Sequence, residues 1–242
     1  MGLADDIATW IRTTVHDAGA EGVVIGLSGG VDSAVAAALA QRSLPGKVLC
    51  AMLPCESDPQ DAEDARLVAA AIGVETLLID LTDTFRALKA VLPEGTKLAE
   101  ANLKPRLRMI ALYYLAASHS YLVCGAGNRV ELTTGYFTKY GDGGVDLLPL
   151  GGLLKSQLRQ LARELAIPQR VIDKPPTAGL WPGQTDEGEM GLRYAQLDVA
   201  LLALDRHDPS GVPAPILSRL RELMRKSAHK RLPPPMFVPK RR

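Results

Sequence analysis

One stretch near the N-terminus, VVIGLSGGVDSAVAAALA (residues 23–40), limits what this chain can fold into more than any other. It begins with a continuous apolar run, which is typical of a parallel strand covered on both faces. It ends in an alanine-rich segment of high helix propensity. The glycine-rich turn between them, residues 28–33, therefore joins the carboxyl end of a buried strand to the start of a helix.

Strand and helix signals alternate along the first half of the chain. Asp58 is the expected N-cap of one helix, Pro59 its first residue and Gly73 its end. The alternation predicts an α/β fold, a doubly wound parallel sheet with flanking helices and right-handed crossovers. We expect strands at 22–27, 47–53, 75–81 and 121–127, and helices at 4–18, 32–43, 58–73, 82–91 and 106–120.

After residue 127 the pattern changes. Residues 128–154 are rich in glycine and polar residues, a helix is expected over 155–166, and two more helices close the chain. Residues 174–191 form an irregular segment whose length is typical of a functional loop. Because no repeat or low-complexity linker interrupts the sequence, we expect one domain over residues 1–242, with a basic, proline-rich tail from about residue 229.

Composition excludes several classes of protein. The formal net charge is +1, so no global field recruits nucleic acid or an acidic membrane. No apolar run is long enough to span a bilayer, and the N-terminus lacks a signal-peptide pattern. Three cysteines form no C-x-x-C pair, which fits a reducing cytosol best. Cys50 and Cys124 are expected in the core.

The turn at residues 28–33 has the character of a phosphate site. Ligands of open α/β sheets bind at the carboxyl ends of the strands, where glycines and a helix N-terminus suit an anion. The turn contains no Walker lysine and no G-x-G-x-x-G fingerprint. Asp32 is unsuited to direct phosphate contact, and a Mg²⁺ ion between carboxylate and phosphates explains it best. The alternative is a plain turn with Asp32 as a helix cap.

The sequence SGGVDS after an apolar strand resembles the pyrophosphate loop of the N-type ATP pyrophosphatases, which have an adenine-nucleotide alpha-hydrolase-like fold. Members of that superfamily split ATP between its α and β phosphates and adenylylate an oxygen atom before a nitrogen nucleophile enters. Later motifs resemble the NAD synthetase family in order and spacing, from about residue 20 to 238: KPRLRM (104–109), GNRVE (127–131), GYFTKYGDGGVD (135–146), LPLGGLLK (148–155), KPPTAGLWPGQTDE (174–187) and HKR (229–231).

The resemblance implies roles for individual residues. Asp32 and Lys155 would be catalytic, and Asp32 with Glu131 would hold Mg²⁺. One departure is Ala126, which stands where many members have threonine. The implied ATP-binding residues are Gly26, Leu27, Ser28, Gly29, Gly30, Val31, Asp32, Ser33, Lys155 and Thr177. The implied contacts to deamido-NAD are Arg106, Lys139, Asp146, His229 and Lys230.

The lysine and arginine side chains among these residues fit the charge of the implied substrates. ATP and a dinucleotide are both polyanions, and their repulsion in a dry cleft requires fixed positive charge. The implied reaction is amidation of deamido-NAD to NAD through an acyl-adenylate, which releases AMP and pyrophosphate. The alternatives are another amidating or tRNA-modifying pyrophosphatase, or a non-catalytic nucleotide-binding protein.

Three further expectations concern partners and motion. The synthetase-like fold uses the whole chain, so we expect free ammonia as nitrogen donor, with a separate glutaminase partner left open. Family members resemble one another in being homodimers, which we also expect here. Residues 175–190, with exposed-looking Leu180 and Trp181, are predicted to be a lid that closes over ATP.

Overall fold

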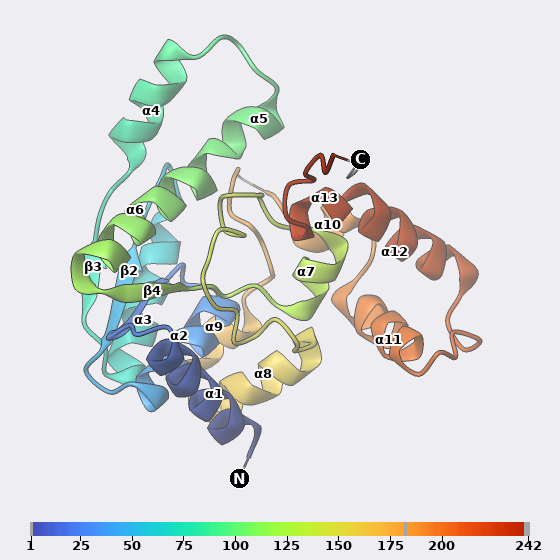
Figure 1. Cartoon of the computed structure of the whole chain (residues 1–242), viewed down its shortest axis with the longest axis horizontal. Helices are drawn as coiled ribbons and strands as arrows, with labels where there is room; N and C mark the ends of the chain where they lie inside the picture. The colour runs from blue at the N-terminus through green and yellow to red at the C-terminus, as the bar shows by residue number, and fades with distance from the viewer. Residues whose placement is uncertain (1, 182, 240–242) are drawn as a thin grey trace.

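A computed structural model describes residues 2–181 and 183–239 of the chain. Within them, four parallel strands form one sheet in the order β3–β2–β1–β4, and helices flank both faces (Figure 1). The predicted α/β fold with a parallel sheet is confirmed. The strands are β1 (Gly22–Gly26), β2 (Val48–Met52), β3 (Thr76–Leu78) and β4 (Tyr121–Cys124).

Helices follow each strand and recur, separated by loops, through the second half of the chain. None of those in the described ranges is long and apolar enough to cross a membrane. The first six are α1 (Leu3–Asp17), α2 (Val31–Ser43), α3 (Pro59–Ile72), α4 (Thr82–Val91), α5 (Lys97–Ala101) and α6 (Leu103–His119). The others are α7 (Arg129–Thr134), α8 (Lys155–Glu164), α9 (Gln169–Asp173), α10 (Asp186–Met190), α11 (Tyr194–Asp205), α12 (Ala214–Lys226) and α13 (Ala228–Arg231).

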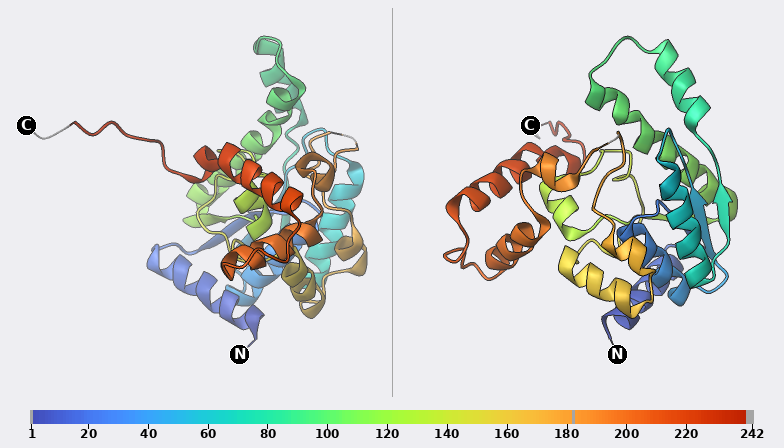
Figure 2. Two further views of the ribbon diagram at one scale, coloured as in Figure 1. Left: turned by 90° about the vertical axis from the view of Figure 1, so that its right-hand side faces the viewer. Right: turned by 180° about the vertical axis from the view of Figure 1, so that it is seen from behind.

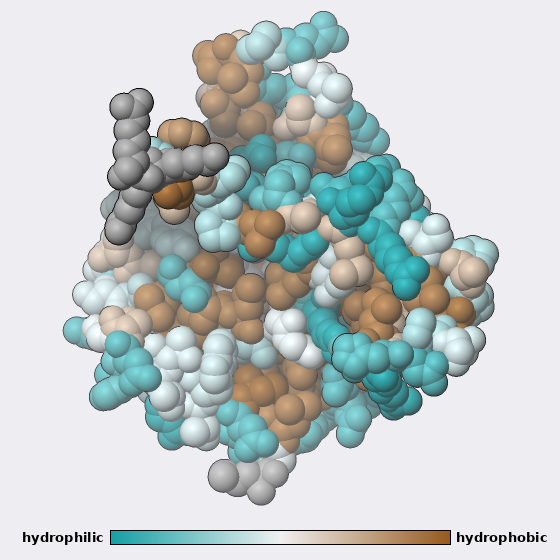
Figure 3. All heavy atoms as spheres, turned by 45° about the vertical axis from the view of Figure 1, so that its right-hand side comes forward, coloured by the Kyte–Doolittle hydropathy of each residue, from teal (hydrophilic) through white to brown (hydrophobic). Residues whose placement is uncertain are grey.

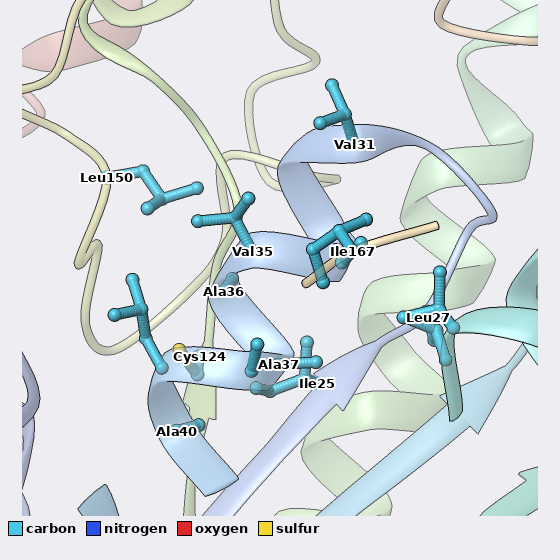
Figure 4. Close-up of a cluster of buried hydrophobic side chains, with 14 of the residues drawn as sticks. Ile25, Leu27, Val31, Val35, Ala36, Ala37, Ala40, Cys124, Leu150 and Ile167 are labelled. Carbon is cyan, nitrogen blue, oxygen red and sulfur yellow. The ribbon is translucent and has the colours of Figure 1, made fainter. Parts of the chain in front are cut away.

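Strand β1 is buried on both faces, as its apolar run predicts. Val23 and Ile25 pack on one side against α1 and α2, and Figure 4 shows Ile25 beside Ala37. Val24 points to the opposite side, where α4 and α6 supply the contacts. This division follows from the strand period of two residues. Cys50 and Cys124 are in the core, and burial raises the pKa of each thiol to about 12.

A third apolar cluster lies away from the sheet, where α11 and α12 pack on each other and on α7. Figure 2 shows these helices beside the sheet layers. Buried Leu197, Leu201 and Leu220 form part of their shared interior. Tyr194 and Val130 belong to this cluster, so its packing places them near the carboxyl edge of the sheet.

Helix ends follow the local signals. The Asp58 side chain accepts a hydrogen bond from the Gln60 N–H, and Gly73 ends α3 in the left-handed region. The polar stretch before residue 106 is more helical than predicted: Thr96 caps α5, and α6 already begins at Leu103. Pro105 is tolerated there because the first turn of a helix needs no backbone donor. Helices α7, α9 and α10 were not expected from the sequence.

Two parts project from the body of the molecule. Helices α4 and α5 form an arm with exposed Val91, Leu92 and Leu98, and apolar surface gathers at the top of Figure 3 where the arm stands. Residues 232–239 extend away from α13 (Figure 2), with Phe237 92% exposed. Residues 240–242, the end of the predicted basic tail, lie outside the described residues, as does Pro182 of the predicted lid.

The strand order defines where a ligand site is expected. The chain proceeds from β1 through β2 to β3 and then returns to place β4 on the other side of β1. The crevice at the carboxyl ends of β1 and β4 is therefore the topological switch point, where open α/β sheets bind ligands. The turn at 28–33 and the segment 125–131 both lie there.

Candidate active site

The loop after β1 is held by its two serines. Ser28 Oγ and Ser33 Oγ lie 3.0 Å apart, and the Ser33 hydroxyl donates to the Gly30 carbonyl at 2.9 Å. Leu27 and Val31 are buried and belong to the core (Figure 4). The loop therefore offers backbone N–H groups, hydroxyls and the start of α2 at the edge of the sheet, which together suit phosphate.

Gly29 is required by its backbone and by its surroundings. Its φ is +77°, in the left-handed region that favours glycine. A Cβ there would lie 2.3 Å from the backbone oxygen of Asp61 and 3.0 Å from Asp64 Cβ. The phosphate loop thus rests directly on the first turns of α3.

Asp32 and Lys155 meet in the middle of the site. Lys155 Nζ lies 2.6 Å from Asp32 Oδ1 and 2.9 Å from Oδ2, and the lysine is 4% exposed. The ring of Tyr194 covers the ammonium group with 4.8 Å between Nζ and the ring centroid. Burial alone would lower the pKa of Lys155, but Asp32 and Glu131 outweigh it and raise the pKa. Lys155 therefore stays charged beside the phosphate loop.

Glu131 lies in the first turn of α7, within the field of Asp32. Burial, and then the charge of Asp32, raise the pKa of Glu131 well above its usual range. Asn128 joins the two carboxylates, because its side-chain amide donates to Asp32 Oδ2 at 2.8 Å and its backbone N–H donates to Glu131 Oε2 at 3.0 Å. Two carboxylates and one lysine thus converge where β1 and β4 end.

A third carboxylate stands behind Glu131. The Tyr194 hydroxyl donates to Asp186 Oδ2 at 2.9 Å and lies 3.4 Å from Glu131 Oε1. Asp186 is 4% exposed, and burial raises its pKa. Tyr194 therefore contacts the lysine through its ring and the carboxylates through its hydroxyl.

The site fits a magnesium ion that ATP helps to hold. Mg²⁺ is usually bound by one or two carboxylates together with phosphate oxygens and water. Asp32 and Glu131 supply two hard oxygen donors beside the phosphate loop. Within residues 2–181 and 183–239, no three His, Cys, Asp or Glu side chains form a ready-made metal cage. The remaining ligands would come from the nucleotide.

Four of the five residues implied for the dinucleotide gather in a second group. Arg106 of α6 donates to the Lys139 carbonyl at 3.4 Å, and Lys139 Nζ donates to the His229 carbonyl at 2.7 Å. Lys230 Nζ donates to the carbonyls of Gly135 and Phe137, at 2.7 and 2.6 Å. The structure thus brings α6, the loop after α7 and α13 together.

The other predicted residues lie apart from these two groups. Asp146 is exposed, with Oδ1 accepting from the Tyr113 hydroxyl at 2.9 Å and Oδ2 from the Val123 N–H at 2.8 Å. Thr177 is exposed, and its Oγ1 accepts from the Gly179 N–H at 3.1 Å. Among the contacts of the described residues, none joins Thr177 to Asp32 or Lys155.

A family model for NAD synthase matches residues 3–234. The chain belongs to the NAD synthase family. A protein from Carboxydothermus hydrogenoformans named NH(3)-dependent NAD(+) synthetase is 46% identical over 94% of this chain and 93% of its own length. A protein of the same name from Archaeoglobus fulgidus is 47% identical over 97% and 95%.

Two solved structures share the fold over nearly all of both chains. NMN synthetase from Francisella tularensis has a TM-score of 0.88 and 36% identity, covering 98% of this chain and 97% of its own. The NH3-dependent NAD synthetase from Campylobacter jejuni, solved with nitrate, has a TM-score of 0.85 and 29% identity, covering 98% of both.

Three residues of the candidate site were missed by sequence reasoning. Asn128 and Glu131 form the N-x-x-E pattern of a capping box, which predicts the start of α7 and could have drawn attention to Asn128. Asp186 lies inside the GQTDE motif, but no function was assigned to it from the sequence. Tyr194 had no sequence signal, because only packing of α11 on α7 and α8 brings it to the lysine.

Proposed function

We propose that the protein is an ammonia-dependent NAD synthetase, a ligase that amidates deamido-NAD at the expense of ATP. The products are NAD⁺, AMP and pyrophosphate. The proposal is carried by one observation: the phosphate loop, Asp32, Lys155 and Glu131 converge at the switch point of a chain that belongs to the NAD synthase family. The names of the relatives support the same reaction.

In the first step, a nicotinate carboxylate oxygen attacks the α-phosphorus of ATP. The new P–O bond forms as the bond from the α-phosphorus to the bridging oxygen breaks, and pyrophosphate leaves. The loop at 28–33 holds the phosphates through backbone N–H groups and hydroxyls, and Lys155 neutralises charge on them. A Mg²⁺ ion held by Asp32 and Glu131 would stabilise the same charge when bound.

In the second step, ammonia attacks the activated carbonyl carbon, the C–O bond to AMP breaks, and the nitrogen releases one proton to give the amide. Arg106 and Lys139 are proposed to hold the phosphates and the carboxylate of the dinucleotide close to Asp32 and Lys155. Further contacts to the dinucleotide are proposed for Asp146, His229 and Lys230. Thr177 would reach ATP only if residues 175–190 move. The chain's contribution is to position two polyanions and neutralise their charge.

The decisive experiment incubates the protein with ATP, Mg²⁺, deamido-NAD and ammonium, and measures AMP and NAD⁺ together. Equal amounts of both are expected. ADP in place of AMP would exclude adenylylation. Binding of ATP with no turnover would favour the alternative of a non-catalytic nucleotide-binding protein.

A second candidate acceptor follows from the likeness to an NMN synthetase over 98% of this chain. An enzyme that makes NMN by this chemistry would amidate nicotinate mononucleotide in place of the dinucleotide. Competition between equal concentrations of deamido-NAD and nicotinate mononucleotide measures the preference. A product ratio in favour of NMN would change the substrate but leave the chemistry intact.

A further inference from the structure

Asn128 stands where three elements of the site meet, between the end of β4, the start of α7 and the first turn of α2. The residue is fully buried. Its Oδ1 accepts from the Glu131 N–H at 3.1 Å, its own N–H donates to Glu131 Oε2 at 3.0 Å, and its Nδ2 donates to Asp32 Oδ2 at 2.8 Å. Three hydrogen bonds of one residue therefore go to the two proposed metal ligands.

Asp32 has two side-chain hydrogen-bond partners in the described parts of the chain, Lys155 and Asn128. Lys155 is proposed to neutralise the phosphates of ATP, so its ammonium group would be shared between Asp32 and the nucleotide. A neutral amide that is fully buried has no such second role. Asn128 is therefore the contact of the Asp32 carboxylate that the nucleotide does not share.

An amide suits this position better than the alternatives. Asp32 and Glu131 repel each other when both are charged, and the charge of Asp32 adds to burial, the larger cause, in raising the pKa of Glu131. A carboxylate at position 128 would add to that repulsion, whereas a hydroxyl would cap α7 without also reaching Asp32. An asparagine has both an acceptor for the helix N-terminus and a donor for the carboxylate.

We propose that Asn128 is a positioning residue that keeps Asp32 and Glu131 converged on one divalent cation while Lys155 is shared with the phosphates. The inference rests on the function proposed above. It assigns to Asn128 an effect on metal affinity that is separate from its effect on the stability of α7.

The variant Asn128→Ser separates the two effects, because serine is also a good N-cap but lacks the amide donor. Binding of Mn²⁺ would be measured by electron paramagnetic resonance, with an ATP analogue that has a methylene bridge between the α and β phosphates. We expect the dissociation constant for Mn²⁺ to rise about tenfold, since one hydrogen bond to a charged group is lost. The KM for deamido-NAD should change less than about twofold.

Asn102→Ser is the matched control, because it removes the same amide from a half-buried asparagine whose Oδ1 accepts from the Thr138 hydroxyl. It should lower the melting temperature and leave Mn²⁺ affinity unchanged. If Asn128→Ser behaves in the same way, Asn128 is only a helix cap and the inference is wrong. Asn128→Thr, which keeps the cap and fills more volume, replaces the serine variant if that one does not fold.

Two further outcomes separate this inference from the proposed function. If Asp32→Asn and Glu131→Gln leave Mn²⁺ binding intact, the metal site itself is misplaced, and the inference falls with it. The wild-type protein could make no NAD⁺ while the Asn128→Ser variant binds Mn²⁺ more weakly than the wild type. In that case the proposed reaction is wrong and the role of Asn128 stands.

Discussion

At the scale of single residues, the site contains more carboxylates than cationic side chains. Asp32, Glu131 and Asp186 surround one buried lysine, and burial raises the pKa of both Glu131 and Asp186. Such an arrangement costs stability in the empty protein, since buried like charges repel with little solvent to screen them. A divalent cation would relieve that cost, which is the physical reason to expect one here.

The variant Asp32→Asn tests this assignment. We expect the turnover number to fall about 100-fold or more, because one charge that holds the cation is lost while side-chain volume is kept. The protein should remain folded by circular dichroism, since an amide oxygen still accepts from Lys155. Asp205→Asn, which alters an exposed pair with Arg129, is the control and should keep full activity. Near-wild-type turnover of Asp32→Asn would show that Asp32 does not hold the cation and is only an acidic residue in the first turn of α2, where Gly30 is the N-cap.

The variant Gly29→Ala tests the close approach of the phosphate loop to α3. Gly46 has a similar φ of +76°, but a Cβ there meets nothing within 4 Å. Gly46→Ala therefore measures the conformational cost alone, about 1 kcal/mol in the free energy of unfolding. Gly29→Ala should cost at least about 1 kcal/mol more, because backbone must shift, and should raise the KM for ATP. Equal costs in urea denaturation would show that the loop does not rest on α3.

At the scale of elements, residues 175–190 are better anchored than their sequence predicts. Leu180 and Trp181 are half-buried, not exposed: Lys97 Nζ lies 4.7 Å from the centre of the Trp181 ring, and Lys104 donates to the Leu180 carbonyl at 3.1 Å. Lys174 contacts Asp61 at 2.8 Å and Asp64 at 2.6 Å, on the helix that supports the phosphate loop. These contacts link the start of the segment to the ATP side of the site.

The lid remains a prediction, and the contacts of Trp181 give a way to test it. Trp10 is the only other tryptophan of the sequence, so Trp10→Phe leaves one fluorophore. Addition of ATP and Mg²⁺ should shift its emission and slow protease cleavage near Gly183, because the segment must move to bring Thr177 to the phosphates. Demonstrated ATP binding with neither response would show a static loop.

At the scale of the whole molecule, the first prediction concerns the nitrogen donor. Relatives that match 94% and 97% of this chain are named NH(3)-dependent NAD(+) synthetase. The three cysteines are buried, and burial raises the pKa of each thiol, so none has the character of the activated nucleophile that a cysteine glutaminase needs. We therefore expect ammonium to support NAD⁺ formation and glutamine to support none with the purified chain. Equal rates with the two donors, in protein free of contaminating glutaminase, would contradict this.

Assembly is the second prediction at this scale. We expect a homodimer in which the exposed apolar side chains Ile110 and Tyr114 of α6 are covered, since they are 59% and 73% exposed in one chain. Sedimentation equilibrium should give twice the mass of the chain, 25.9 kDa. Ile110→Lys should produce a monomer, whereas Arg12→Glu on α1 should not. A fully active wild-type monomer would refute the expectation.

Local signals in the sequence determined most elements of the first half of the chain and the phosphate loop. Asp58, Pro59 and Gly73 bound α3 because capping and backbone preferences act over a few residues. The short apolar run at 22–27, which ends in a glycine-rich turn, predicts a buried strand between two layers. The tertiary structure alone decided the rest. Asp32, Asn128, Lys155 and Tyr194 are far apart in sequence, and they meet only because β4 returns beside β1 and α11 packs on α7 and α8. Such long-range packing leaves no periodic or capping signal, since it depends on shapes and charges that exist only after folding.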